Sequence, residues 1–321
     1  MTNYEYRPIS TDQYFSYNFK AQVLLRDISL RVNIPIQKLN YADIIAYFQK
    51  NFNLHFSFYD TDPVKKHEKY RKQRWVQSIP STGWIKYKKI IPGASFSVLD
   101  EEIVDRVSGF TIPDGKRTLI MINQDCTFPR LVFTILHELC HFYFHIRDNL
   151  KKEVFVSLTS DKLEGNYSEE MIPFEDEANN IGSMLFCSEQ ILEEMLLTKM
   201  KFSEMCNYIG MSEPAMHNRL LNYLEHVHKL PHGMALYYVL KFRKRDIYTV
   251  NLIISKIRAI YKEREKQEET LQLIKMQSVY VDKLKGTPFW DTILEEMNYL
   301  KEPLYNYYSE PKRYRDQDYP F

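Results

Sequence analysis

The chain has 321 residues, 44% of them hydrophobic, which is enough to bury a sizeable core and to form about two compact units. Its formal net charge of +1 excludes the strong charge excess of proteins that bind nucleic acids or membranes through bulk charge. The four cysteines form no CxxC pair and no evident disulfide framework, no apolar run approaches the length of a membrane span, and the first residues do not resemble a signal peptide. We therefore expect a cytoplasmic protein with reduced cysteines and no attachment to a membrane.

The N-terminal part predicts two helices followed by a strand. Apolar residues recur at helical spacing over residues 12–33, and Pro35 interrupts the pattern. The apolar face of this first helix is expected to carry Phe15, Phe19, Val23 and Ile28. Asn40 is a typical cap for a second helix, whose apolar residues are Ile44, Ile45, Phe48 and Phe52. Residues 54–59 alternate between apolar and polar side chains, which indicates a strand.

A basic stretch and two further predicted strands come next. Residues 65–74 are crowded with lysine and arginine, opposed by Glu68 alone. We interpret them as a solvated loop or helix face, with a patch for an acidic partner or nucleic acid as the alternative. Residues 84–87 and 117–123 have the composition of strands, and Pro113-Asp114-Gly115 is typical of a turn.

An H-E-x-x-H motif lies within the apolar helical run that follows. This helix is expected to begin at Thr127, a typical cap, with Pro129 in its first turn. His137 and His141 would lie one turn apart on the same face, so both imidazoles can bind one ion. Glu138 would sit about 100° round from His137, close enough to reach a water molecule bound to that ion. Two imidazoles on zinc with a carboxylate as base is the zincin arrangement, so the motif predicts a metal-dependent hydrolase.

Catalytic zinc needs three protein ligands and an open position for water. One class of zincins takes the third ligand from the extended motif H-E-x-x-H-x-x-G-x-x-H, which is absent here. His145 lies on the same helix but two turns from His137, which is too far to share its ion. We interpret His145 as a wall of the cleft or as a core histidine with a partner.

The third ligand is therefore expected from a second helix, which should begin near Phe174 after Pro173. One face of that helix carries Glu175, Ala178, Asn179 and Gly182. The small residues would allow a close approach to the motif helix, Glu175 would reach the ion, and Asn179 would hydrogen-bond a ligand imidazole. Glu177, on the opposite face, is the alternative ligand. A third interpretation is that both acidic residues only stabilise the start of the helix.

From about residue 189 onward the sequence is predicted to be almost entirely helical. Residues 202–220 resemble a helix-turn-helix, with a helix, a glycine turn, and a serine cap followed by proline. If the second of these helices read DNA, the contacts would come from Asn218, Arg219 and Asn222. The charged stretch 255–275 predicts a long solvated or coiled helix, and the tail after Pro303 is expected to be poorly ordered.

Taken together, these motifs resemble the ImmA/IrrE family of metallopeptidases over roughly residues 40–225. The family signature is F-T-x-x-H-E-x-G-H followed by E-x-x-A-N-x-F-A-x-x-L, and strand 119–123, which ends in asparagine ahead of the helix, also matches. This chain matches the signature at Phe133, Thr134, His137, Glu138, His141, Glu175, Ala178, Asn179 and Leu185. It departs from it at Cys140, Ile181 and Gly182, where the family has Gly, Phe and Ala, and the span between His141 and Glu175 is long. These departures leave the expected ligands intact.

The resemblance implies a gluzincin-like endopeptidase. In it His137, His141 and Glu175 would hold one zinc ion, or another divalent ion such as Mn²⁺, and Glu138 would be the general base. Members of the family cleave or inactivate helix-turn-helix transcriptional repressors, so the implied partner is such a repressor. Their helix-turn-helix-like segment packs against the core, so direct contact with nucleic acid is not expected, and the oligomeric state stays open.

We therefore predict an α+β fold. Its zincin-like core would be a small antiparallel or mixed sheet packed on the motif helix and the glutamate helix, followed by a mainly helical C-terminal region. The predicted parts are an N-terminal helical segment with the first strand (1–60), the metalloprotease core (61–200) and the helical region (201–321), which includes the helix-turn-helix-like segment 202–223.

The predicted function is zinc-dependent hydrolysis of a peptide bond in a specific protein, with Glu138 as general base. The alternative is a non-catalytic regulator that binds a repressor or DNA and has a structural or vestigial metal site. A third possibility is a chance motif in a helical protein. An extended substrate is expected to pair with strand 119–123, and candidates for stabilising the oxyanion are Tyr143, Tyr167 and His217.

Overall fold

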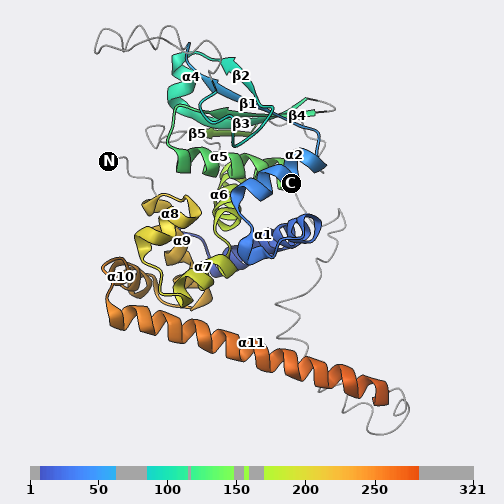
Figure 1. Cartoon of the computed structure of the whole chain (residues 1–321), viewed down its shortest axis with the longest axis vertical. Helices are drawn as coiled ribbons and strands as arrows, with labels where there is room; N and C mark the ends of the chain where they lie inside the picture. The colour runs from blue at the N-terminus through green and yellow to red at the C-terminus, as the bar shows by residue number, and fades with distance from the viewer. Residues whose placement is uncertain (1–7, 63–84, 115–116, 148–154, 159–169, 282–321) are drawn as a thin grey trace. The chain divides into compact units, whose positions relative to one another are not determined.

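The computed structural model describes residues 8–62, 85–114, 117–147, 155–158 and 170–281 (Figure 1). By its internal contacts the chain divides into two units, Met1–Asn251 and Leu252–Phe321. The first unit contains a mixed sheet packed on the helix that carries H-E-x-x-H, with further helices following it. This arrangement confirms the predicted α+β class. The second unit contains most of the long helix α11 (Ile247–Val281).

Five described strands form one sheet in the order β2-β1-β4-β3-β5. Their bounds are Leu54–Asp60 (β1), Ser95–Val98 (β2), Val107–Asp114 (β3), Arg117–Asn123 (β4) and Phe155–Leu158 (β5). β1 runs parallel to β2 and β4, whereas β3 runs antiparallel to β4 and β5. β4 has the predicted bounds, but it is hydrogen-bonded along both sides, so the prediction that a substrate pairs with residues 119–123 is wrong. Among the described strands the edges are β2 and β5.

The two faces of the sheet bury different side chains because residues alternate along each strand. On one face, Met121 packs with Tyr59 and with Val104 of the short helix α4 (Glu101–Arg106). The other face meets α5 (Phe128–Cys140), the motif helix, through β3, β4 and β5. Ile120 and Ile122 alternate with Met121 and are fully buried. The motif helix is therefore held against a hydrophobic sheet.

The first helix, α1 (Thr11–Val32), forms where it was predicted, and Ser10 caps it through a capping box with Gln13. The predicted apolar face is wrong except at Ile28, because Phe15, Phe19 and Val23 are 36%, 36% and 46% exposed. The buried face consists of Tyr14, Tyr17, Ala21, Leu24, Leu25 and Ile28. This face is the buried one because α1 packs against α6 (Ile172–Phe186), a contact that no local sequence pattern reveals.

The next elements are the 3-10 turn η1 (Ile36–Lys38) and the helix α2 (Tyr41–Asn51). Asn40 caps α2 as predicted, and its side-chain oxygen accepts hydrogen bonds from the amides of Ala42 and Asp43.

Residues 86–90 form a turn and not the strand predicted over 84–87. Pro113 and Asp114 belong to β3 and not to the predicted turn. The basic stretch 65–74, Tyr167 and the tail after Pro303 lie outside the described residues.

The helices after α6 are α7 (Glu189–Leu197), α8 (Phe202–Ile209), α9 (Glu213–Asn222), the π-turn η3 (Tyr223–Val227) and α10 (His232–Arg243). α8 and α9 form the predicted helix-turn-helix: Gly210 ends α8 at a φ of 82°, and Ser212 caps α9. Arg219 of α9 is 2% exposed, so it is a core residue and is not available to DNA. Within the described residues, no helix is both long and apolar enough to span a bilayer.

The predicted boundaries at residues 60 and 200 stay predictions. β1, which belongs to the predicted N-terminal segment, lies in the same sheet as β4 of the predicted core. The hydrogen bonds between these two strands tie the N-terminal segment to the part of the chain that carries the motif.

Candidate metal centre

The motif helix α5 is positioned by its apolar face and by two glycines that lie against it, Gly109 of β3 and Gly182 of α6. Leu131, Val132, Ile135, Leu136 and Leu139 are fully buried against the surrounding elements. The helix begins after Thr127 with Pro129 in its first turn, as predicted, although the Thr127 side chain makes no capping hydrogen bond. α5 continues directly into the π-turn η2 (His141–Ile146).

Gly182 permits the close approach between α5 and α6 that the small residues predicted. A β-carbon at this position would lie 3.4 Å from the amide nitrogen of His137 and 3.5 Å from its Cα. Ala178, one turn earlier on α6, is fully buried as well. Because the two backbones lie this close, Glu175 near the start of α6 reaches the face of α5 that carries the two imidazoles.

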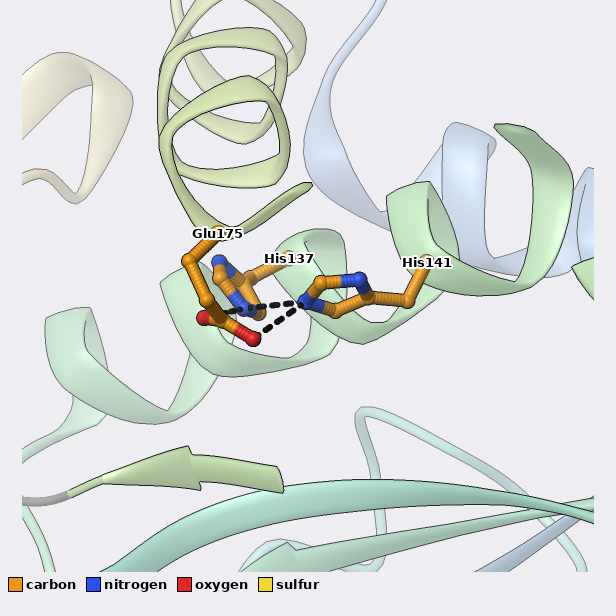
Figure 2. A group of neighbouring side chains, drawn as sticks. All are labelled: His137, His141 and Glu175. Atoms are coloured by element: carbon orange, nitrogen blue, oxygen red, sulfur yellow. Dashed lines mark hydrogen bonds and ion pairs between the residues drawn. The ribbon is translucent and has the colours of Figure 1, made fainter. Parts of the chain in front are cut away.

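The side chains of His137, His141 and Glu175 converge at this contact (Figure 2). The Nε2 atoms of the two histidines lie 2.8 Å apart. Oε2 of Glu175 lies 3.3 Å from Nε2 of His137, and Oε1 lies 3.3 Å from Nε2 of His141. The three residues are 1%, 0% and 4% exposed, respectively. They are therefore a buried group of two imidazoles and one carboxylate that all face the same point.

The electrostatics of this group favour a positive charge between the three side chains. Burial alone would lower the pKa of His137, but the hydrogen bond and the charge of Glu175 outweigh it and raise that pKa. Burial and the neighbouring His137 lower the pKa of His141 to about 3. Burial opposes ionisation of Glu175, yet its hydrogen bonds with His137 and His141 lower its pKa to about 2. The carboxylate of Glu175 is therefore held in its ionised form beside the two imidazoles.

These donors fit a divalent metal ion. In a tetrahedral zinc site with bonds of about 2.0–2.1 Å, ligand atoms stand roughly 3.3 Å apart. Both oxygen-to-nitrogen distances of Glu175 equal 3.3 Å, and only the two Nε2 atoms, 2.8 Å apart, would have to separate. Two histidines and one glutamate are also a donor set of catalytic zinc sites.

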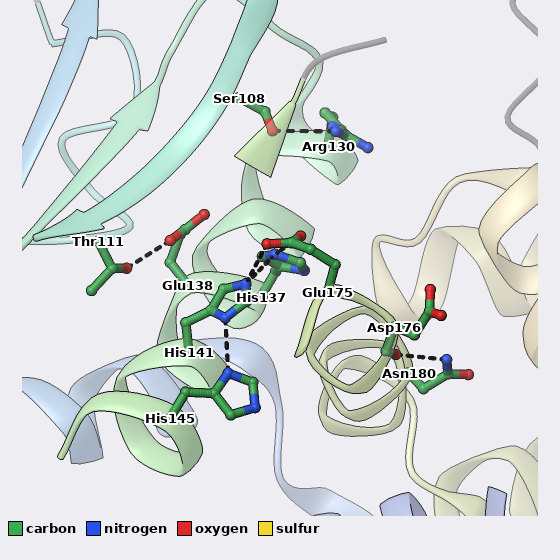
Figure 3. A network of polar contacts seen from close by, with 10 residues as sticks. All are labelled: Ser108, Thr111, Arg130, His137, Glu138, His141, His145, Glu175, Asp176 and Asn180. Carbon is green, nitrogen blue, oxygen red and sulfur yellow. Dashed lines mark hydrogen bonds and ion pairs between the residues drawn. The ribbon is translucent and has the colours of Figure 1, made fainter. Parts of the chain in front are cut away.

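Glu138, the predicted base, points from α5 towards the sheet (Figure 3). The hydroxyl of Thr111 on β3 donates a hydrogen bond of 2.6 Å to its Oε2. Next to Thr111, Gly109 leaves room for the carboxylate, since a β-carbon there would lie 3.1 Å from Oε1 of Glu138 and 2.6 Å from Cγ2 of Thr134. Sequence reasoning missed both Thr111 and Gly109 because it missed β3, and no motif marks them.

His145 and Glu177 lie beside the group and not within it. Nδ1 of His145 lies 2.9 Å from Nδ1 of His141 (Figure 3), and its Nε2 lies 3.6 Å from Oε1 of Glu177. His145 is 7% exposed. Of the two alternatives predicted for it, it is therefore the core histidine with partners and not a wall of the cleft. Glu177 pairs with Lys20 of α1 at 2.6 Å.

The other predicted residues have different surroundings. Nδ1 of His137 has no hydrogen-bond partner among the described residues, so the contact predicted for Asn179 is not made there. Of the oxyanion candidates, Tyr143 packs against Phe48 and under Arg147, and His217 contacts Arg243.

The Cys140 thiol is fully buried, and burial raises its pKa well above the ordinary value. All four cysteines are free.

Comparison with known proteins bears on the same part of the chain. Residues 101–221 match a peptidase family model described as the IrrE N-terminal-like domain. The matched segment contains β3, β4, α5 and α6, and therefore all three converging donors together with Glu138 and Thr111. A search of curated proteins found no match for the chain.

Proposed function

We propose that the protein is a zinc-dependent endopeptidase, because residues 101–221 match the model of the IrrE N-terminal-like peptidase family. The observation that carries the proposal is the convergence of His137, His141 and Glu175, with Glu138 on the same helix as the two histidines. The match to the family extends over both helices that contribute these residues. Two histidines and a glutamate as ligands, with a carboxylate base between the histidines in sequence, are the parts of an H-E-x-x-H zinc peptidase.

In the proposed reaction, the protein residues bind the ion, hold a base and move a proton. A divalent ion held by the three donors would polarise the scissile carbonyl and lower the pKa of a water molecule to about 7. Glu138 accepts the proton of the attacking water at Oε1 and later transfers it to the leaving amine. The hydrogen bond from Thr111 to Oε2 holds the carboxylate of Glu138 in one orientation during both transfers.

For the substrate, we propose an extended segment that pairs with β5, an edge strand next to β3. β5 pairs with β3, whose Thr111 hydrogen-bonds Glu138, so a strand added at β5 would join the end of the sheet that holds the proposed base. The substrate protein itself is proposed from the family resemblance alone, as a helix-turn-helix transcriptional repressor in the cytoplasm. Zinc is the proposed ion, with Mn²⁺ as the alternative.

A second candidate function is a non-catalytic regulator with a structural metal site. The burial of the group favours it, because the three donors are at most 4% exposed and Glu138 is fully buried. A peptide bond has to reach a catalytic ion from solvent, whereas a structural site needs no such access. The two functions make different predictions for Glu138, which a structural site does not need.

The deciding experiment compares the wild type with Glu138→Gln and His141→Ala. Each protein is purified without chelator, its metal content is measured, and it is incubated with a helix-turn-helix repressor as the proposed substrate. The peptidase proposal predicts that the wild type and Glu138→Gln each bind one ion per chain. It predicts that Glu138→Gln cleaves the substrate about 10²- to 10⁴-fold more slowly than the wild type. It also predicts that His141→Ala loses the ion.

The control is His226→Ala, which removes another histidine of 2% exposure that lies outside the group. We expect this variant to retain both ion and cleavage. If Glu138→Gln keeps the ion and the full biological output, the regulator is correct and the peptidase proposal is wrong. A wild type without any bound ion contradicts both candidate functions.

A further inference from the structure

A row of polar side chains runs from the candidate metal centre to the N-terminal helix. Nδ1 of His141 lies 2.9 Å from Nδ1 of His145 (Figure 3). On its other side, Nε2 of His145 lies 3.6 Å from Oε1 of Glu177, the distance of an ion pair. The same oxygen accepts a hydrogen bond of 2.6 Å from Nζ of Lys20. The row therefore connects η2, α6 and α1.

The chemistry of imidazole determines which nitrogen donates and which accepts in each hydrogen bond of this row. An ion bound at Nε2 of His141 requires the proton of that ring on Nδ1. Nδ1 of His141 can then only donate, so Nδ1 of His145 must accept and must carry no proton. The remaining ring proton of His145 is then on Nε2, facing the Glu177 carboxylate, whose charge favours that arrangement. Only one proton arrangement satisfies the whole row.

The backbone explains why the two rings meet. Residues 141–146 form a π-turn, in which the amide of Arg147 bonds the carbonyl of Phe142, five residues earlier, at 2.8 Å. Positions i and i+4 are neighbours on one face of a helix, so His145 follows His141 on the side of the chain that carries the imidazoles. The ring centroids of His141 and His145 lie 5.1 Å apart.

We propose that His145 is a positioning residue which, backed by Glu177 and Lys20, fixes the ring orientation and the protonated nitrogen of His141 for metal binding. The proposal rests on the proposed metal site. Residues that accept the second ring proton of a metal-binding histidine raise metal affinity about 10- to 100-fold. Lys20 lies on α1, outside the matched segment 101–221, so the N-terminal helix takes part in metal retention.

The test measures Zn²⁺ affinity of the full-length protein by competition with a chromophoric chelator. We expect His145→Leu to weaken binding about 10- to 100-fold. His145→Asn keeps an oxygen acceptor near the position of Nδ1, so it should stay within about threefold of the wild type. Lys20→Met should weaken binding by a smaller factor than His145→Leu, because it acts through Glu177 and His145. The matched control is His226→Leu, a substitution at another buried histidine outside the row (2% exposed, against 7% for His145), which should bind zinc like the wild type.

A second readout distinguishes positioning from loss of packing. In the Co²⁺-loaded protein, the Nδ1 proton of His141 gives a paramagnetically shifted resonance, whose exchange with solvent slows when the proton is hydrogen-bonded. We expect slow exchange in the wild type and in His145→Asn, and fast exchange in His145→Leu. If the wild type binds zinc and His145→Leu binds it equally well with unchanged proton exchange, the positioning role is wrong. A wild type that binds no zinc contradicts the metal site itself, so the two failures are distinguishable.

Discussion

The hydroxyl oxygen of Thr111 lies 2.6 Å from Oε2 of Glu138, and both residues are fully buried. A residue of the sheet therefore orients the proposed base on the helix. We expect Thr111→Val, which keeps the shape but removes the donor, to lower the free energy of unfolding by about 1–3 kcal/mol, because a buried carboxylate loses a hydrogen bond. Urea denaturation measures this change, and cleavage should slow in the same variant.

The control for this prediction is Thr111→Ser, which retains the hydroxyl. It should keep most of the stability and of the cleavage rate. If Thr111→Val is as stable and as active as Thr111→Ser, the hydrogen bond to Glu138 has no part in either property.

Metal binding should stabilise the fold. A ligand that binds only the folded state at about 100 times its Kd raises the free energy of unfolding by about 2.7 kcal/mol. We therefore expect Zn²⁺ to raise the Tm of the wild type and a chelator to reverse the rise. His141→Ala should show no such response. An equal rise in His141→Ala would mean that zinc binds elsewhere, and thermal melts with and without chelator provide the measurement.

The close contact at Gly109 predicts strong sensitivity to one added methyl group. The β-carbon of Gly109→Ala would lie 2.6 Å from Cγ2 of Thr134 and 3.1 Å from the carbonyl oxygen of Met121. Overpacking of this kind costs about 1–3 kcal/mol, which denaturation curves can measure. Gly233→Ala is the matched control, because no atom lies within 4 Å of its added carbon, and in helix α10 it should stabilise by up to about 1 kcal/mol. Equal stability of the two variants would contradict the contact.

Arg219 should matter for folding and not for DNA binding. Its Nε donates a 2.8 Å hydrogen bond to the carbonyl of Cys187, and Nη1 donates one of 3.1 Å to the hydroxyl of Tyr14. We expect Arg219→Met to cost about 3–5 kcal/mol, because breaking a buried charged network leaves its partners unsatisfied. Arg243→Met removes a partly exposed ion pair with Glu213 and should cost less than about 1 kcal/mol. A fully stable Arg219→Met that lost affinity for DNA would support the DNA-reading alternative.

The carboxylate of Asp27 predicts a pH dependence of stability. Burial opposes its ionisation, but hydrogen bonds from Tyr47 and Arg31 outweigh burial and lower the pKa of Asp27. A carboxyl whose pKa is lower in the folded state stabilises the fold above its unfolded pKa of about 3.9, and this contribution is lost as the pH falls through the folded value. Tyr47→Phe should therefore be less stable than the wild type at pH 7, by about 0.5 kcal/mol. The difference should shrink towards pH 2, and a constant difference in denaturation experiments at both pH values would contradict this explanation.

Elements with a local signal were predicted well. The proline and the motif spacing located α5, the cap residue Asn40 located α2, and the alternation in residues 54–59 located β1. β3 was missed because Gly109 and Pro113 weaken its strand character, and its hydrogen bonds to β4 and β5 are long-range contacts. The buried face of α1 was assigned wrongly because that helix carries apolar side chains on two sides, and only contact with α6 decides between them.

The same distinction holds for the site. The spacing of His137 and His141, and the small residues on α6, were sufficient to expect these side chains and Glu175 to meet, and the structure brings them together. The pairing of Glu177 with His145 joins α6 to the π-turn η2, two elements whose contact no local pattern reveals, and the π-turn itself has no recognised sequence signal. Thr111 is an ordinary strand residue in sequence, and only the sheet register places it opposite Glu138.

The parallel pairing of β1 with β4 has a practical consequence for any shortened version of this protein. A fragment restricted to residues 101–221 would lack β1 and β2, and β4 would become an open edge with unpaired backbone amides and carbonyls. Exposed edges of this kind recruit strands from other molecules. The segment that carries the family match should therefore aggregate when it is expressed alone, because β1 no longer covers the edge of β4.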